Sequence, residues 1–487
     1  MNILIIQQRN WSIKFGISLA EKLFNKGHKV AAISVKKSTH NILKDNKFIH
    51  PLWSHDEIYE NQNNKIKYNF SLNDVSDQLG IDSVWELIQS QRNLVKSYDK
   101  KYYYSFKQST SDENIKNYIL RLFEIYNEIF EKFKPDIIIS PVLNSFLHAS
   151  INLLCKKKQI PILATTDSKV DGKNIFTNSY LDDEGEFFDY LKSIRRNEIQ
   201  LDRTEIYKAE TFIKNKIKQL KSVDYINTNQ KINSRYFFTC IKGFLRSFKF
   251  KKKDYPLGSS IDLTSPWIYL RDLFYQHLYN YKSKRFPYNN LEKIDNFAFM
   301  PLLLQPEENI DLISTKFNNQ IETARQVAMS LPANMTLVVK DHPHMSDKRS
   351  TSYLEKIKHL PNVKLVDCRI PSWKIFEKAK IVIATSGTTV FEAAILNKYT
   401  IQLGKLGTIR MLPNVIYQPD LSLLKNTVMK VLAKYNCLQS LKKEGYPIII
   451  AAAVREVEAI INACQDAGIV VSALCDSEKR KSEKLIC

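Results

Sequence analysis

Two short polar segments in the latter half of the chain carry residue types suited to binding a phosphorylated ligand. The first is Lys340-Asp341-His342-Pro343, and the second runs from Thr385 to Glu392 with the sequence TSGTTVFE. Each follows an apolar run typical of a buried strand, 336–339 in the first case and 380–384 in the second. Ligands of open α/β sheets bind at the carboxyl ends of the strands, so we expect both segments to face one crevice.

The second segment has the composition of an anion-binding turn. Ser386 and Gly387 are small enough for backbone N–H groups to approach a ligand, and Thr388 or Thr389 is predicted to cap the helix that follows. The free N–H groups of a first helical turn attract phosphate, and Glu392, one turn further on, is placed to meet the hydroxyls of a ribose. A capped strand-to-helix connection without a ligand would explain the same residues equally well.

The first segment offers an imidazole held by a turn. Pro343 fixes the backbone after His342, and Lys340 and His344 add positive charge nearby. Neutral histidine can donate a hydrogen bond to a phosphate oxygen and protonated histidine can neutralise it, which suits a sugar-phosphate leaving group. We expect no metal, because the histidines lack the i, i+4 spacing of a helical site and no Cys-x-x-Cys pair accompanies them.

With these segments in place, the chain resembles the bacterial capsule and surface polysaccharide biosynthesis proteins, a group of GT-B glycosyltransferases that includes sialic acid and Kdo transferases. The resemblance runs from Met300 to about Gly404 and is carried by MPLLLQPE at 300–307, VKDHP at 339–343, LPNVKL at 360–365, TSGT at 385–388, Glu392-Ala393 and Asn397-Lys398. The chain departs from the family at Asp341, where glutamate is common, and at Glu308 and Asn309, where small hydroxyl residues are common. The donor sugar therefore stays open.

The resemblance implies an α/β protein of GT-B type, with two Rossmann-like domains facing a cleft. The N-terminal domain would bind the acceptor and the C-terminal domain the nucleotide sugar. This donor is a substrate, for example a CMP-linked sugar as in the sialic acid and Kdo transferases of the family, so no cofactor is expected. His342 would act in catalysis as well as binding. The residues expected at the donor are Gln305, Glu307, Lys340, His342, Pro343, Ser386, Gly387, Thr388, Thr389 and Glu392.

The N-terminal half supplies candidates for the acceptor side. Its start reads as strand, helix and strand, without the G-x-G-x-x-G of a dinucleotide site. Asp167 follows a predicted strand at 161–165 and is our candidate for the base that takes a proton from the acceptor hydroxyl. An Asx-turn at Asp167 is the competing interpretation. Lys169 and Lys173 are predicted to bind an acidic acceptor.

Length and composition support a division into domains. A chain of 487 residues exceeds one ordinary core. We predict an N-terminal Rossmann-like acceptor domain at 1–200, a helical basic insertion at 201–295, and a C-terminal Rossmann-like donor domain with terminal helices at 296–487.

The formal net charge of +21 indicates a surface that attracts polyanions. Residues 221–254 mix lysine and arginine with aromatic side chains, which favours peripheral contact with an anionic membrane. A solvated helical insertion is the alternative, and nucleic-acid binding is not expected because no nucleic-acid fold accompanies the segment.

No apolar run reaches the roughly 18 to 20 residues of a membrane helix, and Met1 to Ile6 does not resemble a signal peptide. The seven scattered cysteines are typical of reduced thiols. The sequence therefore predicts a cytoplasmic protein, peripheral at the inner face of the plasma membrane.

Together these features predict a metal-independent glycosyltransferase that moves a sugar from a nucleotide-sugar donor to a surface polysaccharide or glycolipid acceptor, such as capsule or lipopolysaccharide. A sugar-nucleotide epimerase, which needs no acceptor, is one alternative. A non-catalytic polyanion or nucleotide-sugar binding protein is the other.

Overall fold

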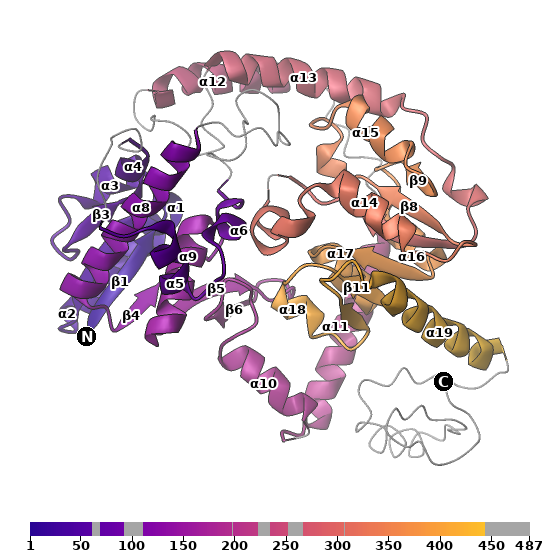
Figure 1. Ribbon diagram of the computed structural model, residues 1–487, viewed down its shortest axis with the longest axis horizontal. Coiled ribbons are helices and arrows are strands. Elements are labelled where there is room, and N and C mark those ends of the chain that lie inside the picture. Colours follow the sequence, from indigo (N-terminus) through magenta and orange to yellow (C-terminus); the bar gives the residue numbers. More distant parts are fainter. Residues whose placement is uncertain are drawn as a thin grey trace.

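The computed structural model describes residues 1–60, 69–91, 111–196, 198–222, 234–251, 266–305 and 307–443. Two α/β domains are joined by a series of helices (Figure 1).

The N-terminal sheet is built from short apolar strands in the order β3-β2-β1-β4-β5-β6. All neighbours are parallel except β5 and β6, which form an antiparallel pair. The strands are β1 (Asn2–Gln7), β2 (Lys29–Ser34), β3 (Leu52–Ser54), β4 (Ile137–Ile139), β5 (Ile162–Asp167) and β6 (Asn174–Thr177).

Helices cover this sheet because their apolar residues recur at helical spacing. In α8, for example, Ile119, Leu122, Phe123 and Tyr126 are fully or almost fully buried in the main core of the domain. The helical segments are α1 (Arg9–Trp11), the π-helix η1 (Ser12–Gly16), α2 (Ile17–Asn25), α3 (Lys37–Leu43), α4 (His55–Glu60), α5 (Leu72–Leu79), α6 (Val84–Ile88), α8 (Asp112–Glu128), the π-helix η2 (Ile129–Phe133) and α9 (Phe146–Lys158).

The C-terminal sheet is parallel throughout, in the order β12-β11-β10-β7-β8-β9. Its strands are β7 (Phe297–Pro301), β8 (Thr336–Lys340), β9 (Val363–Val366), β10 (Ile381–Ala384), β11 (Thr400–Gln402) and β12 (Val415–Tyr417). Its helical segments are η4 (Leu291–Lys293), the π-helix η5 (Asn309–Ile313), η6 (Thr315–Phe317), α14 (Gln320–Met329), η7 (Pro343–Met345), α15 (Thr351–Lys358), α16 (Ser372–Lys378), α17 (Thr388–Ile395), α18 (Gly407–Arg410) and α19 (Leu424–Lys443).

Both sheets follow the same topology. Numbered from the first strand of each domain, both orders are 3-2-1-4-5-6, the order of a Rossmann fold. The predicted fold class, two Rossmann-like α/β domains, is confirmed. The strand order reverses between β1 and β4 in one sheet and between β7 and β10 in the other, and ligands bind beside such reversals, at the carboxyl ends of the strands.

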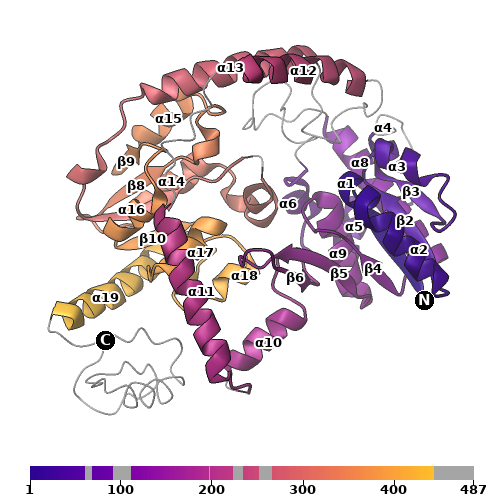
Figure 2. The same cartoon turned by 180° about the vertical axis from the view of Figure 1, so that it is seen from behind.

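Helices of the middle segment link the domains. These helices are α10 (Glu186–Arg195), α11 (Arg203–Ser222), α12 (Ser234–Lys251) and α13 (Pro266–Lys284). α12 and α13 arch along the outside of the molecule from one domain to the other (Figure 1), and α11 crosses to the C-terminal domain, where it contacts α17 (Figure 2). In the described part of 201–295, helices run from Arg203 to Ser222, from Ser234 to Lys251 and from Pro266 to Lys284, and the predicted division into three domains stays a prediction. Residues 223–233 and 252–254 of the predicted membrane segment lie outside the described residues.

Candidate functional site

A cavity of about 490 Å³ lies between the two domains. The turn between β5 and β6 lines one side, the end of α11 a second, and α16 with α17 the third. Five of the predicted site residues are among its lining, namely Asp167, Lys169, Lys173, Thr388 and Glu392. β5 ends at this cavity with Asp167, and α17, the helix that follows β10, lines it from Thr388 onward.

The β5–β6 turn is held by its own side chains. The Asp167 carboxylate accepts hydrogen bonds from the backbone N–H of Lys169 and from its Nζ, both at 2.9 Å. The bond to the backbone two residues ahead is the Asx-turn considered above. Lys169 itself has a left-handed φ of 62° and Gly172 a φ of 73°, which bend the turn around the cavity. Partial burial raises the pKa of Asp167, but the bonds from Lys169 outweigh it, so the pKa is lowered overall.

The start of α17 differs from the prediction. Thr388 and Thr389 were expected to cap the helix, but the N-cap is Gly387, and no side chain caps this end. Gly387 has a φ of 94°, a conformation that favours glycine. The helix therefore begins after a backbone turn at Gly387, without a hydrogen bond from a threonine hydroxyl. Thr388 is left exposed at the cavity.

Lys340 and Glu392 on this side of the cavity interact electrostatically with each other, and Glu392 also interacts with Lys216 on α11. Burial lowers the pKa of Lys340 to about 8, and its Nζ donates to Ile370 O at 3.1 Å and to Ser372 Oγ at 2.7 Å. Burial raises the pKa of Glu392, while the positive charges of Lys340 and Lys216 oppose that rise. Lys340 therefore supports the cavity wall through Ser372 rather than lining the cavity itself.

His342 lies at the end of β8 on a well-supported turn. Its Nδ1 accepts a hydrogen bond from His344 N at 3.2 Å, so the proton of the neutral ring is on Nε2. Burial, followed by the positive charges of His344 and Lys340, lowers the pKa of His342 to about 4. In the protein without ligand the ring is therefore neutral near pH 7 and can donate a hydrogen bond through Nε2. Pro343 opens the short helix η7 that follows.

An ion pair beneath this turn fixes its backbone. Asp341 accepts from His342 N at 2.7 Å and pairs with Arg349, whose side chain is fully buried. Arg349 also donates to Leu303 O, just past the end of β7, at 2.7 Å. The turn after β8 is thus attached to the end of the neighbouring strand.

Several other predicted donor residues have protein partners. Gln305 is 1% exposed, and its amide bonds Asp311, Asn318 O and Gln320. Ser386 is fully buried, donates to Asn309 O at 3.2 Å and accepts from Ser314 Oγ at 3.3 Å. These groups secure the loop after β7 to the loop after β10.

Glu307 and Gly387 lie in the same two loops. Glu307 is half-buried and accepts from Asn309 Nδ2 at 3.2 Å. A Cβ on Gly387 would lie 3.6 Å from Leu303 Cδ2, which places the Gly387 turn against the end of β7.

The structure therefore brings the two polar segments to the same sheet edge but not into the described cavity together. β8 and β10 flank β7 on opposite sides. By strand spacing, their ends are about 10 Å apart. Thr388 and Glu392 line the cavity, whereas His342, Pro343, Gln305, Glu307, Ser386, Gly387 and Thr389 are not among its lining residues. Their roles at the donor stay predictions.

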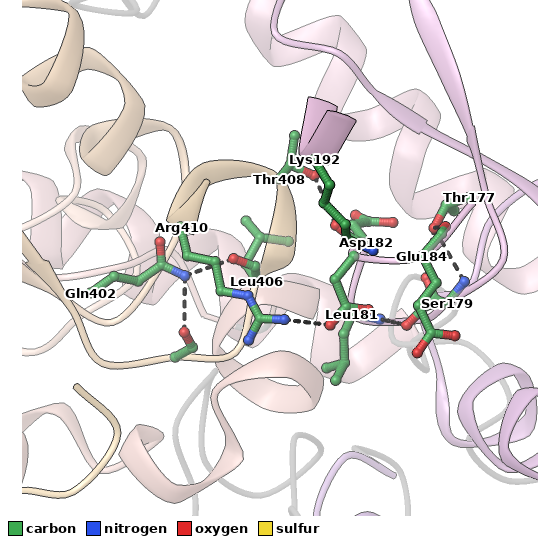
Figure 3. A network of polar contacts seen from close by, with 12 residues as sticks. Thr177, Ser179, Leu181, Asp182, Glu184, Lys192, Gln402, Leu406, Thr408 and Arg410 are labelled. Carbon is green, nitrogen blue, oxygen red and sulfur yellow. Dashed lines mark hydrogen bonds and ion pairs between the residues drawn. The ribbon is translucent and has the colours of Figure 1, made fainter. Parts of the chain in front are cut away.

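The domains are held together beside this site by the segment that follows β6 (Figure 3). Gly407 N donates to Leu181 O at 2.7 Å, Thr408 Oγ1 donates to Asp182 O at 3.3 Å, and Arg410 pairs with Asp183. A Cβ on Gly407 would lie 2.4 Å from Asp182 O, so only glycine permits this approach. The contact fixes the distance between the two walls of the cavity.

Several functional candidates were not predicted from the sequence. Lys216 on α11 lines the cavity and pairs with Asp171 at 3.4 Å. Asp182 accepts from Thr166 Oγ1 at 2.7 Å, and burial raises its pKa to about 6. Trp373 lines the cavity with its indole Nε1 buried and without a partner. The acidic run at 182–184 was a signal in the sequence, whereas Lys216 is one of many lysines on its helix and only the fold selects it.

Within the described ranges, no group of three or more histidine, cysteine, aspartate or glutamate side chains is arranged to hold a metal ion. Among the cysteines whose side chains the structure describes, Cys155, Cys240 and Cys368 are free thiols.

Comparisons with known proteins give no family model and no curated protein that matches the chain. Solved structures that are similar in fold include sugar-nucleotide epimerases and glycosyltransferases. The UDP-GlcNAc 2-epimerase of Neisseria meningitidis is 12% identical, with 96% of this chain and 99% of that chain covered and a TM-score of 0.23. The β-Kdo 2,7 transferase KpsC of Thermosulfurimonas dismutans is 12% identical, with 58% and 69% covered and a TM-score of 0.28. The calicheamicin glycosyltransferase CalG4 is 13% identical, with 94% and 98% covered and a TM-score of 0.23. The fold assignment rests on the strand order of the two sheets, and these similarities assign no substrate to this chain.

Proposed function

We propose that this protein is a nucleotide-sugar-dependent glycosyltransferase whose donor binds in the cavity between its two Rossmann-like domains. The observation that carries the proposal is the lining of that cavity. Three lysines, Lys169, Lys173 and Lys216, line it together with three carboxylates, Asp167, Asp171 and Glu392. Lys169 pairs with Asp167 and Lys216 with Asp171. The positive charge offered to a phosphate therefore comes first from Lys173 and from the first turn of α17, which no side chain caps, while Glu392 can accept hydrogen bonds from hydroxyl groups. A diphosphate or phosphate that carries a sugar matches this combination of charges.

The acceptor enters from the N-terminal side in this scheme. An inverting transfer needs a carboxylate that accepts the proton of the acceptor hydroxyl, and such a base works best when its pKa is near the working pH. Asp167 is accessible at the cavity, but its lowered pKa makes it a weak base. Asp182, whose pKa burial raises to about 6, has the more suitable basicity and lies near Lys169.

The resemblance to a transferase family also suggests which substrates this protein uses. We propose a surface polysaccharide or glycolipid acceptor, and among donors a CMP-linked sugar, on the resemblance of residues 300–404 to the capsule-type transferases. Lys169 and Lys173 at the cavity support an acidic acceptor or donor. A glycolipid acceptor also fits peripheral attachment through 221–254 to the inner face of the plasma membrane.

Nucleotide binding is the first test. Cytidine, uridine and guanosine nucleotides should raise the melting temperature of the full chain in proportion to their affinity, because each binds only the folded state. Lys216→Ala should weaken binding of the preferred nucleotide about ten-fold or more, since it removes a charged hydrogen-bond donor from the cavity. Lys214→Ala, an exposed lysine on the same helix and not part of the lining, is the matched control. Failure of all nucleotides to stabilise the protein contradicts the proposed function, and equal binding by both variants excludes this cavity as the site.

His342 does not line the cavity, but it lies at the same sheet edge, so we propose that the donor extends from the cavity past the end of β7 and accepts a hydrogen bond from the neutral ring of His342. His342→Ala should lower kcat by about 10²-fold, the usual effect of removing one donor from a developing negative charge, with the fold retained. Because its pKa is lowered to about 4, the wild-type contribution should stay constant between pH 6 and pH 8. His344→Ala is the control, since the bond to His342 Nδ1 comes from the backbone of His344. Unchanged kcat in His342→Ala removes this residue from the mechanism.

A product assay without acceptor separates the transferase from the two alternatives. A transferase leaves the nucleotide sugar largely intact until a glycan or glycolipid acceptor is added. Conversion of the donor into an epimeric nucleotide sugar without acceptor identifies an epimerase. Nucleotide-sugar binding without turnover under either condition identifies a non-catalytic binding protein.

A further inference from the structure

The helix α12 presents a stripe of exposed apolar side chains. Phe238, Ile241, Leu245 and Phe248 follow one another at intervals of three, four and three residues, which puts them on one face of the helix. All four are exposed, with Leu245 at 62%. A soluble helix normally turns such a face toward a core. In α12 this face is exposed.

The neighbouring helix α13 repeats the pattern. Trp267, Leu270, Phe274 and Tyr281 also fall on one face by helical spacing, and all are exposed, with Trp267 at 72% and Phe274 at 65%. α12 contacts α13, and both lie on the outer arch of the molecule (Figures 1 and 2). We call the exposed apolar residues of these two helices the arch surface: Phe238, Ile241, Leu245, Phe248, Trp267, Leu270, Phe274 and Tyr281.

The charged residues of α12 and α13 are mostly basic. The sequence of α12 contains five basic residues and no acidic one. The single acidic residue of α13, Asp272, is 8% exposed and pairs with Arg271 at 2.7 Å. Among the side chains that the structure describes, Lys242 on α12 and Lys282 and Lys284 on α13 are exposed. The arch surface therefore combines exposed aromatic and aliphatic side chains with exposed lysines on the same two helices.

We propose that the arch surface docks this protein onto an anionic lipid membrane, with α12 and α13 lying in the plane of the interface. A basic amphipathic helix with Trp, Phe and Leu on one face and lysine beside it is the composition of an interfacial helix. Anionic headgroups complement the lysines, and the rings enter the boundary of the acyl chains. Among the described residues, no helix combines the length and the apolar composition needed to cross a bilayer. Docking is independent of the transfer chemistry, because none of the arch-surface residues lines the cavity.

The test is co-sedimentation of the full chain with vesicles. Binding to phosphatidylcholine vesicles that contain 30% phosphatidylglycerol, as a probe chosen on the basis of its negative charge, should exceed binding to pure phosphatidylcholine by at least about ten-fold. The triple variant Leu245→Ser, Trp267→Ser, Phe274→Ser should lose at least about ten-fold of this binding. These side chains are exposed, so the fold should be unaffected. The control is the triple variant Met329→Ser, Leu423→Ser, Ile13→Ser, which changes exposed apolar residues elsewhere.

Charge is tested separately. Lys242→Glu with Lys282→Glu should reduce binding to the anionic vesicles, whereas Lys425→Glu with Lys430→Glu on α19 changes the net charge equally and should not. Equal binding of the arch variant and the wild type overturns the proposal. So does a dimer in lipid-free solution that the arch variant converts to a monomer, because the surface would then join two copies. The nucleotide-dependent rise in melting temperature should be the same in the arch variant, which separates this proposal from the proposed function.

Discussion

Replacing Arg349 by methionine is expected to lower the free energy of unfolding by about 3–5 kcal/mol, the usual cost of leaving one partner of a buried ion pair uncompensated. Both side chains of the pair are inaccessible, Arg349 at 0% and Asp341 at 3%. Burial already raises the pKa of Asp341 in spite of the nearby arginine, so without Arg349 the carboxyl group should become protonated on folding. Leu303 O would lose the shorter of its two side-chain hydrogen bonds and keep the one from Gln320 Nε2 at 3.2 Å. Urea unfolding followed by circular dichroism measures the change.

A surface ion pair provides the control for this effect. Arg325 binds Glu322 at 2.7 Å on α14, with both side chains more than 40% exposed, so Arg325→Met should cost less than about 1 kcal/mol. The double variant Asp341→Asn, Arg349→Met should recover part of the loss, because no buried charge remains. If Arg349→Met costs no more than Arg325→Met, the pair does not hold the turn after β8. The His342 position would then have to be explained by Pro343 alone.

The sequence was sufficient to predict the parts of the fold that carry long apolar runs. The strands β8 and β10 were predicted because their residues are almost all buried on both faces. The missed strands are β3, β6 and β12, which are edge strands of three or four residues and carry no extended apolar signal. A short edge strand is defined by its pairing partner, which the local sequence does not contain.

The candidate site was predictable only in part, for a related reason. The polar turns at the ends of β5, β8 and β10 could be identified, because each follows an apolar strand directly. The side chains that bind these turns in the folded protein could not be identified from the sequence. Arg349 lies in an ordinary polar turn, and only the fold directs its side chain at Asp341 and Leu303. The predicted N-cap of α17 was wrong. The two threonines after Gly387 suggested a hydroxyl cap, but the positive φ of Gly387 determines where the helix begins.

Acid is expected to destabilise the N-terminal domain through two buried histidines at the carboxyl edge of its sheet. His55 contacts Tyr118 Oη through Nε2 at 2.9 Å, and His148 contacts Ser145 Oγ through Nδ1 at 2.7 Å and Gln8 Nε2 through its own Nε2 at 3.2 Å. Burial lowers the pKa of His55 to about 4 and that of His148 to about 3. The amide of Gln8 as oriented donates to His148 Nε2, so the proton of the neutral ring is on Nδ1, and protonation of Nε2 would break the bond from Gln8.

The direction of this pH effect follows from the number of protons bound by the folded and the unfolded chain. Below pH 6.5 the unfolded chain protonates both histidines while the folded chain does not, so the free energy of unfolding falls as pH falls, by about 1.4 kcal/mol per pH unit for each histidine. Between pH 7 and pH 5 each should cost about 2 kcal/mol. Asp182, whose raised pKa is about 6, acts in the opposite direction over part of this range, so the decisive quantity is the difference between wild type and variant.

His148→Asn isolates one of these contributions, because asparagine keeps a donor for Ser145 Oγ but does not titrate. The variant should lose less stability than the wild type between pH 7 and pH 5, by about 2 kcal/mol, when urea unfolding is measured at both values. His359→Asn, at a side chain that is 76% exposed, should follow the wild type. The same pH dependence in His148→Asn and wild type would mean that His148 takes up its proton within the folded domain. In that case the hydrogen bonds of His148 with Ser145 and Gln8 must rearrange when His148 is protonated. The carboxyl edge of the N-terminal sheet would then hold a charged imidazolium in place of the neutral ring of this structure.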